Sequence, residues 1–154
     1  MRCLTYVCAL TAIVSLPLAA QRPISVTGVQ SLAFGTLLPG IPSSVLRSDA
    51  ARSGQFAVQG PHDSQGLLTF ALPAVLMGPA GATLPLSFAG SDGGYSQSQN
   101  IGSQVGFDPK LPFVITFSQQ GRGSVFLGGT ASSAPTQRAG SYTGTITLIL
   151  ATFP

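Results

Sequence analysis

The chain has 154 residues, of which only 7% are charged, and its net charge is +3. Its basic residues are spread along the sequence, so it lacks the basic cluster that neutralises nucleic-acid phosphates, and we expect no nucleic-acid partner. It contains one His and no Glu, and both Cys residues lie among the first eight. This inventory argues against an enzyme, a metal site and a bound cofactor.

The first twenty residues have the pattern of an export signal. Arg2 supplies a positive charge, residues 3–16 are mostly apolar, and two alanines end the segment. An apolar run of about 14 residues is shorter than the roughly 20 that a membrane-spanning helix needs. We therefore predict a signal peptide at residues 1–20 and export to the periplasm, the outer surface or the medium; an uncut N-terminal anchor is the alternative. Both Cys residues leave with it, so residues 21–154 fold as one domain without a disulfide.

The residues after this segment alternate between apolar and polar side chains, with Gly and Pro at the turns. From Ile24 to Phe34 most even-numbered positions are apolar, which predicts a first strand. Shorter runs at residues 55–59, 67–72 and 84–88 predict further strands. Alternation with a period of two is typical of strands with one buried face, because successive side chains point to opposite faces.

Gly90 to Gly106 is rich in Gly, Ser and Gln and lacks alternation, so we predict a loop. Apolar runs at residues 113–117 and 124–127 predict two more strands. The longest alternating segment runs from Tyr142 to Leu150 and predicts a terminal strand. Its threonines are expected to face water or a neighbouring strand. Its expected core face consists of Tyr142, Gly144, Ile146, Leu148 and Leu150.

These elements together predict an all-β protein. Helical spacing is scarce, no linker divides the chain, and turns recur at intervals of about ten residues. We expect a single antiparallel β-sandwich, immunoglobulin-like or pilin-like, with about seven to nine short strands.

Few residues are candidates for catalysis, metal binding or ligand binding. His62, Asp63 and Ser64 have the residue types of a hydrolase triad, but adjacent residues rarely reach one another in the required relay, so we interpret them as a turn. A calcium site at Asp92 or Asp108 would lack a second acid nearby in the sequence. Tyr95, in the predicted loop, is the one candidate contact for a ligand such as a carbohydrate; an ordinary solvent-facing tyrosine is the alternative.

Three motifs occur in a characteristic order. Residues 32–36 read Leu-Ala-Phe-Gly-Thr, residues 128–130 read Gly-Gly-Thr, and residues 140–145 read Gly-Ser-Tyr-Thr-Gly-Thr. In this order the chain resembles the bacterial family called domain of unknown function 4402, whose members are exported, mostly single-domain β proteins. The motif residues that carry the resemblance are Phe34, Gly35, Thr36, Gly128, Gly129, Thr130 and Gly140.

That family is similar to spore-coat-protein-U-like domains and to fimbrial subunits of chaperone–usher pathways, which implies assembly rather than catalysis. As in such subunits, Gly140 lies fourteen residues before the end and Phe153 is penultimate. The final Pro154 and the lack of Cys after residue 20 depart from the fimbrial pattern. The resemblance implies self-association or pairing with another exported β-sandwich subunit, and a periplasmic chaperone.

Two roles remain open for the N-terminal segment. Ile24, Val26 and Gly28 either form the domain's own first strand, which strand geometry slightly favours, or they insert as part of residues 21–28 into a neighbouring copy's incomplete sandwich. The scarcity of charge fits insertion, because monomers commonly protect sheet edges with charged residues. We predict a non-enzymatic, pilin-like structural protein. The alternative is a monomeric exported module that binds a surface or a carbohydrate through residues 90–106.

Overall fold

The computed structural model describes residues 23–153, so the predicted signal peptide lies outside the described residues. The described chain contains twelve strands and one short 3-10 turn, η1 (Pro79–Gly81). All strand pairings are antiparallel, which confirms the predicted all-β antiparallel fold. Within residues 23–153 no helix is long and apolar enough to cross a membrane. The strands are β1 (Ser25–Gln30), β2 (Ser43–Val45), β3 (Gly54–Gln59), β4 (Gln65–Ala71), β5 (Val75–Met77), β6 (Thr83–Ser87), β7 (Gly93–Ser96), β8 (Val105–Phe107), β9 (Phe113–Thr116), β10 (Arg122–Leu127), β11 (Gly129–Ala131) and β12 (Thr147–Thr152).

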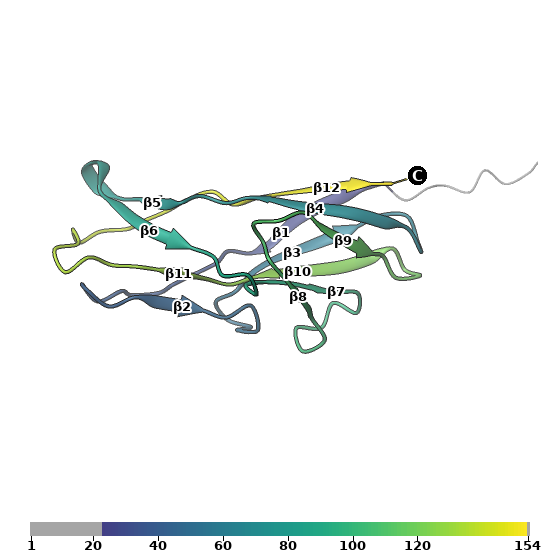
Figure 1. The fold of residues 1–154 in the computed structure, drawn as a ribbon, viewed down its shortest axis with the longest axis horizontal. Coiled ribbons are helices and arrows are strands. Elements are labelled where there is room, and N and C mark those ends of the chain that lie inside the picture. Colours follow the sequence, from purple (N-terminus) through teal and green to yellow (C-terminus); the bar gives the residue numbers. More distant parts are fainter. Residues whose placement is uncertain (1–22, 154) are drawn as a thin grey trace, which may run out of the picture.

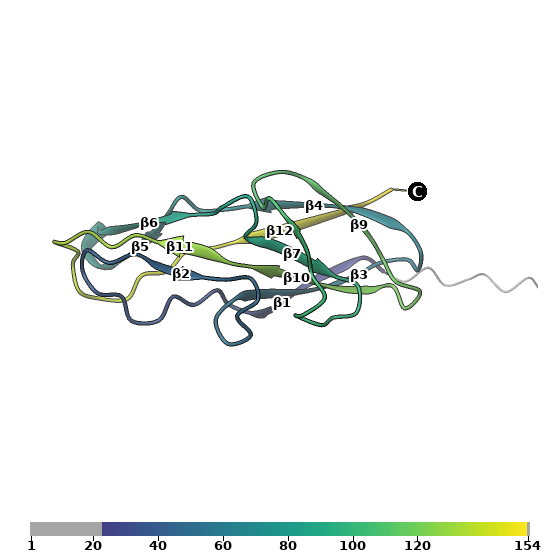
Figure 2. The same cartoon turned by 60° about the horizontal axis from the view of Figure 1, so that its bottom comes forward.

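The strands form three sheets that pack as a β-sandwich. A five-stranded sheet has the order β1-β3-β10-β7-β8, and a three-stranded sheet has the order β12-β4-β9. These two sheets occupy one half of the elongated molecule (Figure 1). A four-stranded sheet with the order β2-β11-β6-β5 occupies the other half, and both views show this division (Figure 2).

There are more strands than the seven to nine predicted, because interruptions divide long extended segments between two sheets. Gly128 separates β10 from β11, and its backbone lies so close to the Val45 carbonyl and the Arg47 amide that a Cβ would clash with both. Pro73 lies between β4 and β5, and proline has no N–H to continue a ladder. Each of these long segments therefore begins in one sheet and ends in another.

The larger core lies between the five-stranded and three-stranded sheets. Alternation on β3 places Phe56 and Val58 on the inner face, and Val58 is fully buried. Phenylalanine rings cross the core: the ring centroids of Phe56 and Phe70 are 5.8 Å apart, and those of Phe107 and Phe113 are 4.4 Å apart. Burial of this apolar surface, at roughly 25 cal/mol per Å², holds the two sheets together.

A smaller core lies on the inner face of the four-stranded sheet. Leu84 and Leu86 on β6 are buried and alternate with exposed neighbours. No complete sheet faces them. Instead, partly buried side chains from two segments without regular strand structure pack over this core: Leu32, Phe34 and Leu37 from the first, and Tyr142 and Ile146 from the second.

The prediction of a loop from Gly90 to Gly106 was wrong in part, because the segment contains β7 and begins β8. Its glycines are strand residues whose missing side chains make room for neighbours. A Cβ on Gly93 would lie 2.7 Å from the Phe107 ring, and one on Gly106 would lie 2.6 Å from the Arg47 guanidinium. Because these positions carry no side chain, the sequence does not display the alternation that the backbone has.

Candidate functional site

A groove runs between the chain that follows β1 and the chain that precedes β12. Residues 31–37 form its first wall and residues 137–146 form its second wall, and its volume is about 790 Å³. Leu76, Leu84 and Leu86 line its floor. Leu84 is only 1% exposed, so the groove opens directly onto the smaller core.

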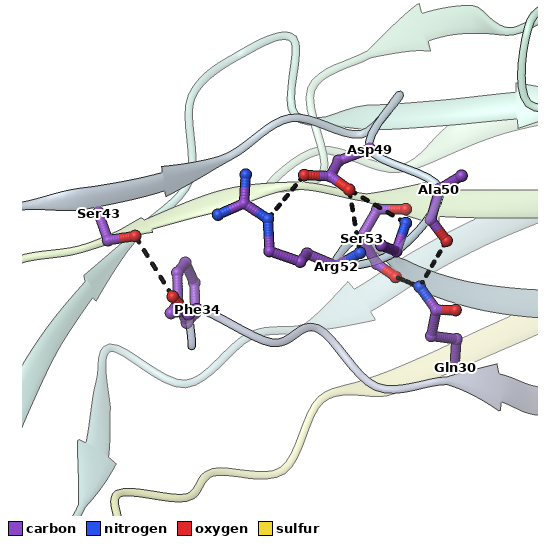
Figure 3. A network of polar contacts seen from close by, with 8 residues as sticks. Gln30, Phe34, Ser43, Asp49, Ala50, Arg52 and Ser53 are labelled. Carbon is purple, nitrogen blue, oxygen red and sulfur yellow. Dashed lines mark hydrogen bonds and ion pairs between the residues drawn. The ribbon is translucent and has the colours of Figure 1, made fainter. Parts of the chain in front are cut away.

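Polar contacts anchor the start of the first wall (Figure 3). Gln30, the last residue of β1, donates its Nε2 to the carbonyl oxygens of Ala50 (3.2 Å) and Ser53 (2.7 Å). The turn that carries these carbonyls is held by Asp49, whose carboxylate accepts a hydrogen bond from the Arg52 guanidinium at 2.7 Å. This hydrogen bond lowers the pKa of Asp49, so the carboxylate stays ionised to a lower pH than an unpaired aspartate would.

Beyond this anchor the first wall makes few hydrogen bonds. The Ala33 amide donates to the Arg52 carbonyl at 2.9 Å. The Phe34 carbonyl accepts a long hydrogen bond of 3.5 Å from Ser43 Oγ (Figure 3). Gly35 then turns the chain with a φ of +71°, a conformation that favours glycine. The first wall is therefore a segment with a turn at Gly35 that no neighbouring strand pairs with along its length.

Tyr142 anchors the second wall. Its ring occupies the place that a Cβ on Gly78 would take. Its hydroxyl accepts a hydrogen bond from Gln137 Nε2 at 2.6 Å and donates one to the Arg138 carbonyl at 2.7 Å. The same Gln137 Nε2 donates to the Thr83 carbonyl at 3.1 Å, which ties the wall to β6.

The backbone of the second wall pairs with the four-stranded sheet at one β-bridge. Thr143 and Met77 exchange two backbone hydrogen bonds, of 2.7 Å and 2.9 Å, at the free edge of β5. Within the part of the chain that the structure describes, Thr143 is the one residue of 139–146 recorded with a backbone–backbone hydrogen bond. Most backbone N–H and C=O groups of the wall therefore remain available to a further strand.

The prediction that the terminal strand starts at Tyr142 was wrong, since the ladder of β12 with β4 starts at Thr147. Thr147 pairs with Ala71, and continuing this register places Thr145 opposite Pro73. Because proline cannot donate a hydrogen bond, the ladder ends there. The segment from Tyr142 to Ile146 becomes a wall of the groove instead of a paired strand.

The five residues of the expected core face divide between the two cores. Leu148 is 8% exposed and belongs to the larger core, and Leu150 packs against it. Tyr142 and Ile146 pack against the smaller core. Gly144 is exposed, which corrects the expectation that it faces the core, and the Leu76 side chain lies where its Cβ would be.

The N-terminal segment lies in this domain's own sheet. Val26 and Gly28 belong to β1 and pair with Val58 and Phe56 of β3. Val26 packs against the larger core, whereas Gly28 has open space where a Cβ would be. Ile24 precedes the strand and is 46% exposed. β1 is therefore an edge strand that buries little apolar surface.

The motif residues lie at turns and close contacts. Phe34 and Gly35 belong to the first wall, and Thr36 is exposed there. Gly129 packs beneath the Phe88 ring. Thr130 shares a hydrogen bond of 2.8 Å with Ser44 across β11 and β2.

The remaining motif glycines, Gly128 and Gly140, lie at places where the chain approaches its neighbours closely. Gly128 occupies the break between β10 and β11 described above. Gly140 has a φ of +146°, and a Cβ there would meet the Pro79 ring. A side chain at Gly140 would therefore displace the second wall of the groove.

Tyr95 was predicted to lie in a loop, either as a candidate ligand contact or as a solvent-facing residue, and the position that both alternatives share was wrong. Tyr95 belongs to β7, is 5% exposed and lies in the larger core. Its hydroxyl donates to the Thr116 carbonyl at 2.9 Å, and its ring fills the space beside Gly123. Burial raises the pKa of Tyr95 to about 12, so the phenol is neutral and structural.

The remaining candidates for catalysis or metal binding are the residues of the His62–Ser64 turn and the scattered aspartates. Ser64 Oγ donates to the Pro61 carbonyl at 2.7 Å, which closes the turn, and His62 is exposed. Residues 23–153 contain no group of three or more His, Cys, Asp or Glu that could hold a metal ion.

The lining of the groove suits an extended and largely uncharged peptide. Its floor and much of its walls are apolar, and Arg138 is the one charged residue that lines it. An extended chain between the walls could pair its backbone with both of them and point alternate side chains at the floor. The sequence signals of the groove are Pro73, which ends the ladder, and the turns at Gly35 and Gly140. These three signals are local, so the sequence does not show that the two walls lie opposite each other.

Comparison of the chain with protein-family models, with curated proteins and with solved structures found no match.

Proposed function

We propose that this chain is an exported, non-enzymatic, pilin-like structural subunit that assembles at the cell surface by β-strand addition. The observation that carries the proposal is the groove between the first and second walls, an opening onto the smaller core that is flanked by extended chain with unpaired backbone. A buried core with an opening between two chain segments whose backbone is largely unpaired is complementary to an added strand. The sandwich then gains stability by accepting that strand.

The proposed occupant is the N-terminal segment of a second copy, residues 21–28. At about 3.3 Å per residue in an extended strand, these eight residues are long enough to run along the seven-residue first wall. Arg22, near the start of the segment, is its one charged residue, so the remainder can enter an apolar groove without burying charge. Ile24 and Val26 then point at the floor, two positions apart.

Release of β1 from its own sheet is the cost of this exchange. In the isolated subunit β1 pairs only with β3 and leaves its other edge free. Its residues Thr27, Gly28 and Val29 are exposed, and a register shift lies between Gly28 and Gln30. A strand in the groove can pair with a wall on each side, whereas β1 pairs with β3 alone. The exchange therefore increases the number of backbone hydrogen bonds that the segment makes.

The proposal also includes the export route and a helper. Residues 1–20 direct the chain out of the cytoplasm, and a periplasmic chaperone covers the groove until a second copy fills it. An uncovered apolar groove and an uncharged sheet edge promote aggregation, which gives the chaperone its physical role.

Disulfide cross-linking between two singly substituted copies tests the proposal. Residues 21–154 contain no Cys, so each variant carries a single thiol. A tagged Val26→Cys copy and an untagged Ile146→Cys copy are refolded together and oxidised. The added strand would bring the two thiols together in the groove, so we expect a mixed disulfide that carries one tag.

A Lys110→Cys copy replaces Ile146→Cys as the matched control, because Lys110 is exposed and does not line the groove. The control mixture should give little mixed disulfide. If Ile146→Cys cross-links no better than Lys110→Cys, strand addition in the groove is wrong, and the subunit is a self-complete monomer.

A further inference from the structure

We propose that a cleft on the outer face of the five-stranded sheet binds a neutral saccharide, independently of the groove. The cleft has a volume of about 440 Å³, within the range of roughly 300–1,000 Å³ of small-ligand sites. It lies between the turn that carries Ala50 and the loop of residues 98–101. Gln55 of β3 and Phe126 of β10 line its base.

The loop between β7 and β8 folds back over the sheet to form one side of this cleft. Ser96, Ser98 and Ser103 hydrogen-bond one another with Oγ–Oγ distances of 2.7–3.2 Å. Asn100 Oδ1 accepts a hydrogen bond from the Gly102 amide at 2.8 Å, which fixes the tip of the loop. The side of the cleft is therefore a hydrogen-bonded structure with a defined shape.

Two side-chain amides in the cleft have no protein partner. Neither Gln55 nor Gln99 makes a side-chain hydrogen bond in the part of the chain that the structure describes. Gln55 is half-buried, whereas Gln99 is exposed at the rim. The Asn100 amide nitrogen also lacks a recorded partner, since its bond to the loop uses the oxygen. Three amide groups can thus donate to or accept from one ligand.

The chemistry of the lining favours a neutral, hydroxyl-rich ligand. No residue that lines the cleft is charged, so a charged ligand would gain no ion pair there. An amide donates and accepts, as a sugar hydroxyl does, so the two groups are complementary. Ala50 and Ile101 provide apolar surface for the C–H face of a sugar ring. Phe126 is 1% exposed, so no aromatic platform stacks on the ligand, and we expect weak, millimolar binding.

Titration by NMR tests the inference on folded, ¹⁵N-labelled protein of residues 21–154. The probes are four neutral oligosaccharides, namely maltohexaose, cellohexaose, xylohexaose and chitohexaose, and one anionic oligosaccharide, hexagalacturonate. We expect saturable shifts of the side-chain amide signals of Gln55, Gln99 and Asn100 with at least one neutral probe. Hexagalacturonate should produce no such shifts at the same concentration.

Two variants and a control give the test its specificity. Gln55→Leu keeps the size of the side chain over Phe126 but removes the amide. Gln99→Gly removes the other amide at a position with a φ of +59°, where glycine relieves strain, so the loop should keep its shape. Each variant should weaken binding about fivefold to tenfold, as expected for one lost hydrogen bond. Gln119→Ala, an exposed residue outside the cleft, should bind like the parent.

Three results would overturn the proposal: no saturable shift with any neutral probe, a response to hexagalacturonate alone, or unchanged binding by both variants. Because the groove lies between other segments, cross-linking of Val26→Cys to Ile146→Cys should not depend on the saccharide. The two proposals can therefore fail separately.

Discussion

Tyr95 lies in a sequence rich in Gly and Ser and yet is one of the buried residues of the larger core. A glycine opposite its ring, Gly123, makes room for this side chain, and two glycines in the Gly-rich segment do the same for other residues. Gly93 leaves room for the Phe107 ring, Gly123 for the Tyr95 ring and Gly106 for the Arg47 guanidinium. At the residue scale, a glycine thus marks the place of another residue's side chain, which cannot be read from a single sequence.

The raised pKa of Tyr95 predicts a pH-dependent stability. The folded-state pKa of about 12 lies above the model value of 10.0, so the unfolded chain loses its proton first as the pH rises. The stabilisation is therefore complete below about pH 10 and is lost as the pH rises through the folded-state value. Urea unfolding at a series of pH values should show this loss for the parent protein.

Tyr95→Phe supplies the comparison for this measurement. The variant should lack the extra loss of stability above about pH 10, because phenylalanine does not titrate. At neutral pH it should be destabilised by only about 0.5–1.5 kcal/mol, the typical net value of one hydrogen bond, since the Thr116 carbonyl keeps the hydrogen bond from Gln97 Nε2. Parallel pH profiles for the two proteins would contradict the buried position of this phenol.

At the scale of elements, alternation predicted most strands and missed their ends. The expected strand from Ile24 to Phe34 is β1 followed by the first wall, and the expected terminal strand is the second wall followed by β12. In both cases the alternating pattern continues where the pairing stops, because the side chains still face a core. Pairing depends on the partner strand, and Pro73 is separated from Thr145 by more than seventy residues of sequence.

Hydrogen exchange can separate the wall from the paired strand. In monomeric protein the amides of β12 should exchange slowly, because β12 is paired with β4. The amides of residues 139–146 should exchange fast, apart from Thr143, which donates to Met77. On assembly, residues 139–146 should become protected, because an added strand pairs with them. Mass spectrometry of peptides from both states measures this change.

Equal exchange of residues 139–146 in the monomer and in the assembly would contradict the proposed strand addition. The amides of β4 provide an internal control, since β4 pairs with β12 on one side and β9 on the other in the isolated subunit. Their protection should not change.

At the scale of the whole molecule, the sequence predicted the fold class and could not locate the groove. The alternation, the turn residues and the lack of helical spacing were sufficient for an antiparallel β-sandwich. The groove depends on the first and last segments lying opposite each other over β6, and this long-range arrangement leaves no local pattern. The cleft beside Gln55 was hidden for the same reason, because β3 and the loop of residues 98–101 meet only in the folded chain.

The central claim, that the groove of one copy accepts the N-terminal segment of another, is tested most directly by an unboiled SDS gel of the protein of residues 21–154. Strand-exchanged copies should separate slowly because many hydrogen bonds must break together, so the account predicts a ladder of oligomers that collapses on boiling. A variant lacking residues 21–28 should run as a monomer while keeping a cooperative thermal melt. Excess synthetic peptide of residues 21–28, added during refolding of the full-length protein, should shorten the ladder. A single monomer band from well-folded full-length protein, or a ladder that the peptide does not change, would contradict the account.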